Sequence, residues 1–256
     1  MDLHIDSAGE GPAVLFLHAG VADSRMWRGQ MELPGYRSVV FDQRGFGKTP
    51  WVPGPYIDWR DSVAVLDSLG IEDVTVVGCS IGGAIALHLA LAVPERVHGL
   101  VLVGAAASGW DPVGGWLEDS LELEAMAAGK AGDLDRVVEL EAAIWLAGVG
   151  RTLEDIDPEL VELFIDMDRV PAATETERHS MVEAFGLTND RLDEIASPTL
   201  VIVGEHDQPD LIESAHYLSS RLSDQPALVI REAAHLPSLE QPETFNAALV
   251  AFLDSL

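Results

Sequence analysis

The stretch from Val74 to Gly83 most constrains what this chain can fold into. Four β-favouring residues end at Gly78, Ser80 follows with a glycine two positions away on each side, and a helical run begins at once. This is a Gly-x-Ser-x-Gly turn between a strand and a helix. Small neighbours let the backbone bend sharply, which exposes the serine Oγ. The pattern predicts that Ser80 is a nucleophile; an ordinary strand-to-helix turn is the alternative interpretation.

Short apolar runs alternate with helical stretches along most of the chain. The predicted strands cover residues 3–5, 13–17, 38–41, 74–77, 99–103, 199–203 and 227–230, and the predicted helices cover 24–33, 58–69, 81–92 and 242–256. Continuously apolar strands are typical of parallel sheets that are buried on both faces. The alternation therefore predicts an α/β fold with a mostly parallel central sheet flanked by helices.

The alternation stops between Gly109 and Asp190. This insert of 82 residues carries 20 acidic residues against 5 Lys and Arg. Ligands of open α/β sheets bind beyond the carboxyl ends of the strands. We therefore expect residues 109–190 to form a helical cap over an α/β core made of residues 1–108 and 191–256; packing on the side of the sheet is the alternative. Its predicted helical apolar faces contain Leu121, Leu123, Met126, Val137, Val138, Leu140, Ile144 and Leu146.

Charge and composition limit the partners that this chain can have. With 43 acidic residues against 15 Lys and Arg, its formal charge is −28. Such a surface repels nucleic acids and anionic membranes, so neither is expected as a partner. The acidic start does not resemble a signal peptide, and no apolar run has membrane-spanning length, so we expect a cytoplasmic protein. Cys79 is the single cysteine, so we expect no internal disulfide. The acidity has two interpretations: an ordinary solvated surface, or adaptation to high salt, where self-repulsion is screened. The oligomeric state is not readable from the sequence.

Two further loops carry side chains that suit a serine nucleophile. Asp207 follows the predicted strand 199–203, and His235 follows the predicted strand 227–230. Ser80 has the same placement, so all three loops should open on one edge of the sheet. A serine nucleophile needs a base and the base needs an orienting acid, in the chain order Ser, Asp or Glu, His for this type of fold. Glu205 and Asp210 are the alternative acids.

Five segments together resemble the α/β-hydrolase superfamily, specifically small capped serine hydrolases, over essentially the whole chain. They are Leu-Phe-Leu-His-Ala-Gly (15–20), Phe-Asp-Gln-Arg-Gly-Phe-Gly-Lys-Thr (41–49), Gly-Cys-Ser-Ile-Gly-Gly (78–83), Gly-Glu-His-Asp (204–207) and His-Leu-Pro-Ser-Leu-Glu-Gln-Pro (235–242). The resemblance implies that Ser80 is the nucleophile, that His235 is general base and then acid, and that Asp207 holds the imidazole. It also implies about seven strands, an abbreviated first edge strand, and a cap inserted after the sixth-strand position.

The resemblance also implies an oxyanion hole built from backbone groups. Its donors should be the N–H of Ile81, directly after the nucleophile, and the N–H of Gly20, in the loop after strand 13–17. The family usually has a glycine where this chain has Ala19. We expect His18 to have a structural role and to hold this loop by hydrogen bonds.

The reaction implied is hydrolysis of a carboxylic ester or lactone through an acyl-enzyme, with no cofactor and no metal. The segment 78–83 looks most like the carboxylesterase and 3-oxoadipate enol-lactonase branch. The acidic insert favours a neutral, partly apolar substrate, unless a buried arginine binds an anion. Alternatives are a carbon–carbon bond hydrolase, a proline iminopeptidase-like peptidase and a non-catalytic ligand-binding protein. The arginines that could bind an anion are Arg136, Arg151, Arg169 and Arg178. Four tryptophans either line an apolar substrate pocket or pack in the core: Trp27, Trp110, Trp116 and Trp145.

Overall fold

The computed structural model describes residues 2–52, 54, 56–113, 115, 120–178 and 186–256. Within them a seven-stranded sheet has the order β1-β3-β2-β4-β5-β6-β7. β1 is antiparallel to β3, and the other neighbours pair in parallel. The predicted α/β fold with about seven strands is confirmed. The strands are β1 Ile5–Ala8, β2 Ala13–Leu17, β3 Arg37–Phe41, β4 Val74–Cys79, β5 Val97–Val103, β6 Thr199–Gly204 and β7 Leu228–Ile230.

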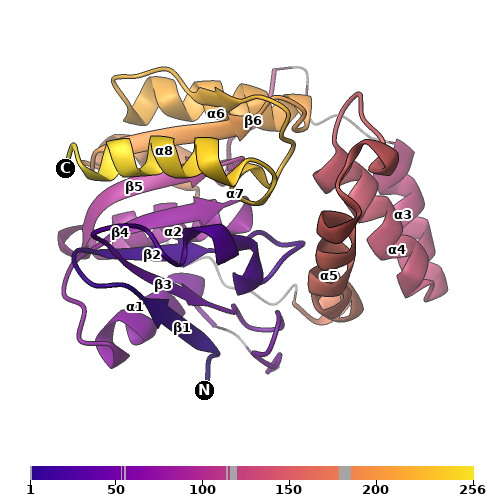
Figure 1. Ribbon diagram of the computed structural model, residues 1–256, viewed down its shortest axis with the longest axis horizontal. Helices are drawn as coiled ribbons and strands as arrows, with labels where there is room; N and C mark the ends of the chain where they lie inside the picture. The colour runs from indigo at the N-terminus through magenta and orange to yellow at the C-terminus, as the bar shows by residue number, and fades with distance from the viewer. Residues whose placement is uncertain (1, 53, 55, 114, 116–119, 179–185) are drawn as a thin grey trace.

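Helices cover both faces of the sheet, and alternate residues of each strand supply the two apolar layers (Figure 1). In β2, Phe16 points into the layer that contains Trp27 and Phe245, whereas Leu15 points into the layer that contains Leu66. Burial on both faces explains why the strands have continuously apolar sequences. The helices of the core are η1 Ser24–Gln30, α1 Asp58–Ser68, α2 Ile81–Ala92, η2 Pro94–Arg96, α6 Pro209–Leu222, α7 Pro237–Glu240 and α8 Pro242–Leu253.

Some predicted elements of the core differ from the observed ones. Residues 24–30 form a 3-10 helix, which is shorter than the helix predicted over 24–33. Gly29 disfavours a regular α-helix, and Pro34 disfavours its extension beyond Leu33. Asp23 caps this helix by accepting a hydrogen bond from the N–H of Arg25. β1 lies at 5–8 rather than 3–5. The sequence prediction did not include α6, which begins at Pro209.

The insert forms a group of helices at one end of the sheet (Figure 1). Its predicted apolar residues from Val137 to Leu146 are buried, but Leu123 and Met126 are 48% and 54% exposed. No helix among the described residues has the length and apolarity needed to cross a membrane. The insert's elements are α3 Ser120–Ala131, α4 Leu134–Glu141, a π-helix η3 Ala142–Ala147, η4 Leu153–Asp155, α5 Pro158–Arg178 and the start of η5 Thr188–Glu194.

Candidate active site

Ser80 occupies a strained turn between β4 and α2. Its φ angle is 55°, in the left-handed region that side chains other than glycine rarely adopt. The turn is compact because its glycines leave no room for a side chain. A Cβ on Gly78 would lie 2.2 Å from the Gly82 carbonyl oxygen, and one on Gly82 would lie 2.3 Å from that of Leu17. The sequence pattern therefore fixes this conformation, and the Ser80 side chain remains half-buried at its tip.

Asp207 and His235 form a buried pair on the loops that follow β6 and β7. Both carboxylate oxygens of Asp207 lie 3.0 Å from Nδ1 of His235, and each residue is 2% exposed. Nδ1–H donates to this carboxylate, which selects the tautomer whose lone pair lies on Nε2 when the ring is neutral. The other candidate acids lie differently. Glu205 is exposed and accepts the Glu232 N–H, and Asp210 lies in the first turn of α6.

Gly104, which directly follows β5, packs closely against the Asp207–His235 pair. A Cβ at this position would lie 2.9 Å from Oδ2 of Asp207 and 3.0 Å from Nδ1 of His235. Its φ angle of +50° also favours glycine. Any larger residue would therefore displace the Asp207–His235 hydrogen bond.

Cys79 connects the Ser80 turn to the loop of His235. Its thiol is fully buried and lies 3.4 Å from the carbonyl oxygen of His235, to which it donates. Burial raises the pKa of this thiol well above its ordinary value, and the carboxylate of Asp207 adds to the effect. Cys79 is thus an inert packing group. Among the contacts of the described residues, the Ser80 hydroxyl makes no hydrogen bond to His235, a looseness common in unliganded sites.

The two backbone segments proposed for the oxyanion hole lie beside each other. A Cβ on Gly20 would contact the Ile81 side chain at 3.6 Å. Ile81 is the first residue of α2, so its N–H has no partner within the helix. The Gly20 N–H donates to no backbone acceptor in the described part of the chain. One donor at a helix start and one in the neighbouring loop can therefore point toward one developing negative charge.

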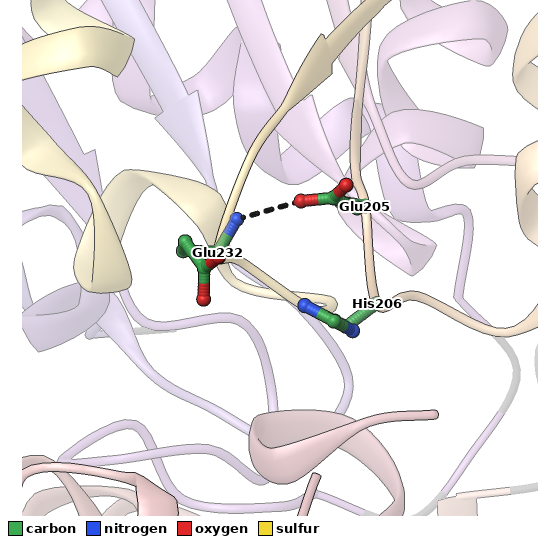
Figure 2. Close-up of side chains that lie close together, drawn as sticks. All are labelled: Glu205, His206 and Glu232. Atoms are coloured by element: carbon green, nitrogen blue, oxygen red, sulfur yellow. Dashed lines mark hydrogen bonds between the residues drawn. The ribbon is translucent and has the colours of Figure 1, made fainter. Parts of the chain in front are cut away.

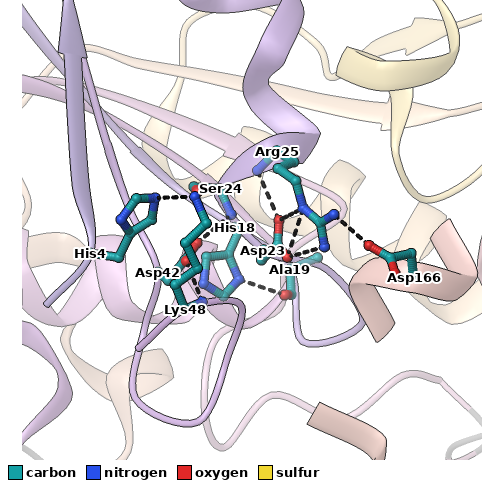
Figure 3. Close-up of polar contacts among 9 residues, drawn as sticks. All are labelled: His4, His18, Ala19, Asp23, Ser24, Arg25, Asp42, Lys48 and Asp166. Atoms are coloured by element: carbon teal, nitrogen blue, oxygen red, sulfur yellow. Dashed lines mark hydrogen bonds and ion pairs between the residues drawn. The ribbon is translucent and has the colours of Figure 1, made fainter. Parts of the chain in front are cut away.

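A hydrogen-bond network holds the loop that contains Gly20 (Figure 3). Nδ1 of His18 donates to the Ala19 carbonyl at 2.9 Å, and Nε2 accepts the Gln43 N–H at 2.9 Å. The Asp42 carboxylate accepts the N–H groups of Ser24 and Lys48. The ring of His18 is thus satisfied as a neutral imidazole, which agrees with its predicted structural role.

Trp145 brings the insert directly against His235. The two ring centroids are 4.8 Å apart, and the His235 N–H donates to the Trp145 carbonyl at 3.1 Å. From the sequence, Trp145 was only one of four tryptophans that could line a pocket or fill the core. Trp27 lies in the core between Phe16 and Phe245, and Trp110 stacks on Tyr217; Trp116 lies outside the described residues.

Arginines of the insert are paired with carboxylates. Arg136 binds Glu124 and Glu139, Arg169 binds Asp135, and Arg151 binds Glu240. The side chain of Arg178 lies outside the described residues. The guanidinium groups of Arg136, Arg151 and Arg169 therefore already have carboxylate partners within the protein.

Glu205, His206 and Glu232 gather where the loops after β6 and β7 meet (Figure 2). One ligand atom from each lies within 4.8 Å of the others, an arrangement that could hold a metal ion. This cluster was not predicted from the sequence, because its residues come from two separate loops. Their contacts join the loops: Glu205 accepts the Glu232 N–H, and Nδ1 of His206 donates to the Val149 carbonyl. Exposed acidic groups are common without an ion, so we assign these side chains to loop contacts.

A sheet of this topology, with a serine turn and a buried Asp–His pair at its carboxyl edge, defines the α/β hydrolases. The family model for the alpha/beta hydrolase fold matches residues 12–147, and the chain belongs to this family of hydrolases. A candidate carbamate hydrolase, RutD, from Azorhizobium caulinodans is 32% identical over 98% of this chain and 94% of its own length. The 3-oxoadipate enol-lactonase 2 of Acinetobacter baylyi is 29% identical over 94% of this chain and 88% of its own.

A solved structure agrees with this membership. The esterase EaEST from Exiguobacterium antarcticum has a TM-score of 0.80 and 26% identity, with 98% of this chain and 95% of that chain covered. The likeness extends over almost the whole of both chains, so the sheet and its helices belong to the fold of this family.

Proposed function

We propose that this protein is a serine hydrolase that cleaves small carboxylic esters or lactones through an acyl-enzyme on Ser80. The observation that carries the proposal is the buried Asp207–His235 hydrogen bond, at 3.0 Å, on the same sheet edge as the left-handed turn of Ser80. A strained serine turn and an oriented neutral imidazole together suit nucleophilic catalysis. Relatives named as esterases and enol-lactonases support this reaction class.

In the proposed mechanism His235 moves protons and Ser80 forms the covalent bond. Nε2 of His235 takes the Ser80 proton as Oγ attacks the carbonyl carbon, and the N–H groups of Gly20 and Ile81 bind the resulting oxyanion. The tetrahedral intermediate then breaks its bond to the alcohol oxygen, which receives the proton from Nε2. Water, deprotonated by the same nitrogen, attacks the acyl-enzyme and releases the acid, and the Ser80 oxygen regains its proton.

Residues 109–190 act in this proposal as a helical cap over the core made of 1–108 and 191–256. The insert contacts loops at the carboxyl ends of three strands. Trp145 lies against His235 beyond β7, Val149 bonds His206 beyond β6, and Asp166 binds Arg25 beyond β2. Ligands of such sheets bind at this edge, so a substrate that reaches Ser80 must pass the insert.

A neutral, partly apolar substrate fits the insert best. A cavity of about 740 Å³ between α3, α4 and α5 contains Met126, Val137, Ile144 and Trp145 along its wall. Its polar lining includes two glutamates and one lysine, Glu122, Glu141 and Lys130. Since the whole insert carries 20 acidic residues, an anionic ester or lactone would be repelled as it approached.

Labelling with a fluorophosphonate probe tests the proposal. The wild-type protein should form one covalent adduct, located on Ser80 by peptide mass spectrometry, and Ser80→Ala should not be labelled. Turnover should then be measured with p-nitrophenyl esters of increasing acyl length, with simple lactones, and with a carboxylate-bearing lactone as the charged counterpart.

Two results would contradict the proposal. Unchanged labelling in Ser80→Ala would place the nucleophile elsewhere, and no labelling or turnover in the folded wild type would favour a binding protein. If labelling succeeds but only carbon–carbon or peptide substrates are cleaved, the ester preference is wrong while the serine mechanism stands.

A further inference from the structure

The segment Trp145–Arg151, here called the clasp, joins the insert to both loops of the Asp207–His235 pair. The Val149 N–H donates to the His206 carbonyl at 2.8 Å, and Nδ1 of His206 donates back to the Val149 carbonyl at 2.9 Å. A Cβ on Gly148 would lie 2.2 Å from the His206 carbonyl oxygen and 2.6 Å from the Ala234 Cβ. The clasp backbone is thus packed against the residues next to Asp207 and His235.

Arg151 binds four acceptors that belong to two different parts of the molecule. Nε and Nη2 donate to the carbonyls of Ala147 and Leu146, at 2.7 and 3.1 Å, where the π-helix η3 ends. Nη1 donates to the Glu232 carbonyl at 3.0 Å, and Nη2 also donates to the Glu240 carboxylate at 2.8 Å. One planar guanidinium therefore connects the helix that carries Trp145 to the loop that carries His235.

Glu240 completes the connection from the core. Its second carboxylate oxygen accepts the Ala234 N–H at 2.9 Å, directly before His235. The side chains of Arg151 and Glu240 are only 12% and 4% exposed. Burial raises the pKa of the Glu240 carboxyl, and the Arg151 guanidinium opposes this rise. Breaking a buried pair leaves an uncompensated charge, so this contact has a much larger effect than an exposed one.

We infer that Arg151 and Glu240 are positioning residues that fix the imidazole of His235 between Asp207 and Trp145. The inference rests on the proposed serine-hydrolase function. The loop residues 232, 234 and 235 each give or receive a backbone hydrogen bond through Arg151, Glu240 or the clasp. A base displaced by about 1 Å can lose about 10²-fold in rate without losing its substrate. Through the clasp, catalysis therefore depends on the position of the insert relative to the loop of His235.

The test measures kcat and KM in Arg151→Ala, Arg151→Lys and Glu240→Gln, using the p-nitrophenyl ester that the wild type cleaves best. Fluorophosphonate titration counts the reactive sites, so kcat is expressed per reactive site and misfolded protein does not contribute. Arg169→Ala is the matched control, because Arg169 belongs to the same insert but pairs with the exposed Asp135. Melting temperatures show that each variant is folded during the assay.

Arg151→Ala should lower kcat per reactive site by about 10-fold to 100-fold while KM changes by less than about threefold. Arg151→Lys should recover part of the loss, because it keeps the charge beside Glu240 but not the four-way geometry. Glu240→Gln should lower kcat, and Arg169→Ala should match the wild type. A purely structural role would lower the number of reactive sites or the melting temperature and leave kcat per site unchanged.

The inference is overturned if Arg151→Ala keeps kcat per site within about twofold of the wild type. If Arg151→Ala does not fold, Glu240→Gln decides by the same criterion. Failure of the proposed function is recognised separately, since it would leave the wild type itself without labelling and turnover, and the inference would then fall with it.

Discussion

The core and the insert of this protein are built under different physical constraints. The core places 23 acidic and 10 basic residues in 174 positions, whereas the insert places 20 and 5 in 82. In the core, β2 and β4 are buried almost completely and carry apolar side chains on both faces. The insert contacts the core through buried apolar residues such as Leu146, Phe164 and Met167, and through the polar contacts of the clasp and of the Arg25–Asp166 pair (Figure 3).

The core and the insert therefore have different roles. The core places Ser80, Asp207 and His235 by sheet topology, which depends on apolar burial and tolerates little change. The insert is free to vary its surface, provided that the clasp stays in contact with the loops after β6 and β7. Under the proposed function, the core would determine the reaction and the insert would determine which substrates reach it.

The largest effect is expected for Asp207→Asn. Loss of the carboxylate removes the acceptor that selects the tautomer of His235, so kcat should fall about 10⁴-fold, with little change in melting temperature. Ester turnover per titrated site measures it. Asp210→Asn is the matched control and should behave as the wild type; the reverse result would show that the wrong carboxylate was assigned as the acid.

Core and insert should also differ in the cost of truncating an apolar side chain. Phe245 is fully buried beside Trp27, so Phe245→Ala should lower the free energy of unfolding by about 3–5 kcal/mol. Leu123 of the insert is 48% exposed, and Leu123→Ala should change it by less than about 0.5 kcal/mol. Urea denaturation measures both. Equal losses would mean that the insert contributes to the apolar core as much as α8 does.

Two glycines with positive φ angles, Gly132 in the insert and Gly104 in the core, distinguish the stability cost of backbone strain from that of a steric clash. Gly132→Ala, in the insert, introduces strain alone, since a Cβ there meets nothing within 4 Å, and should cost about 1–2 kcal/mol. Gly104→Ala adds a contact with Asp207 and His235, so it should cost more and also lower kcat. Thermal denaturation and ester turnover give the comparison. If the two variants lose equal stability and both keep kcat, Gly104 does not support the pair.

Salt should stabilise this protein through the charge of both regions. Because 43 acidic residues repel one another, the melting temperature should rise by about 2–4 °C or more from low to molar KCl, as screening shortens the range of repulsion. Differential scanning calorimetry at fixed pH measures it. A flat or falling curve would contradict the hypothesis of adaptation to high salt.

The smallest effect is expected where the insert meets the core at an exposed pair. Asp166 is 68% exposed where it binds Arg25, so Asp166→Asn should change the free energy of unfolding by less than about 1 kcal/mol and leave kcat unchanged. Urea denaturation and turnover measure it. A loss of kcat as large as that of Glu240→Gln would show that any contact of the insert, rather than the clasp, supports the reaction.

Much of the core could be read from the sequence because its signals are local. Apolar runs predicted β2, β3, β4, β5 and β6 within a few residues, and the glycines around Ser80 predicted its turn. Chain order alone placed Asp207 and His235 after neighbouring strands. Asp207 was expected as the acid, with Glu205 and Asp210 as alternatives, and the packing of β6 against β7 brings Asp207 beside Nδ1 of His235.

Other features depend on contacts that no local pattern carries. η1 was predicted as a helix over 24–33, but it has 3-10 geometry and ends at Gln30. The apolar positions of α3 suggested a face, yet Met126 remains exposed beside a cavity. Arg151 was one of four arginines, and nothing in its neighbours along the chain indicates that it meets Glu240, 89 residues away.

The sequence by itself determined the fold class, the serine turn and the order of Ser80, Asp207 and His235, because strand burial and glycine conformations act over a few residues. Tertiary structure alone decided which tryptophan lies on the ring of His235 and how Arg151 connects the insert to its loop. Those relations join segments that are distant in the chain, and they exist only once the sheet has brought its loops to one edge.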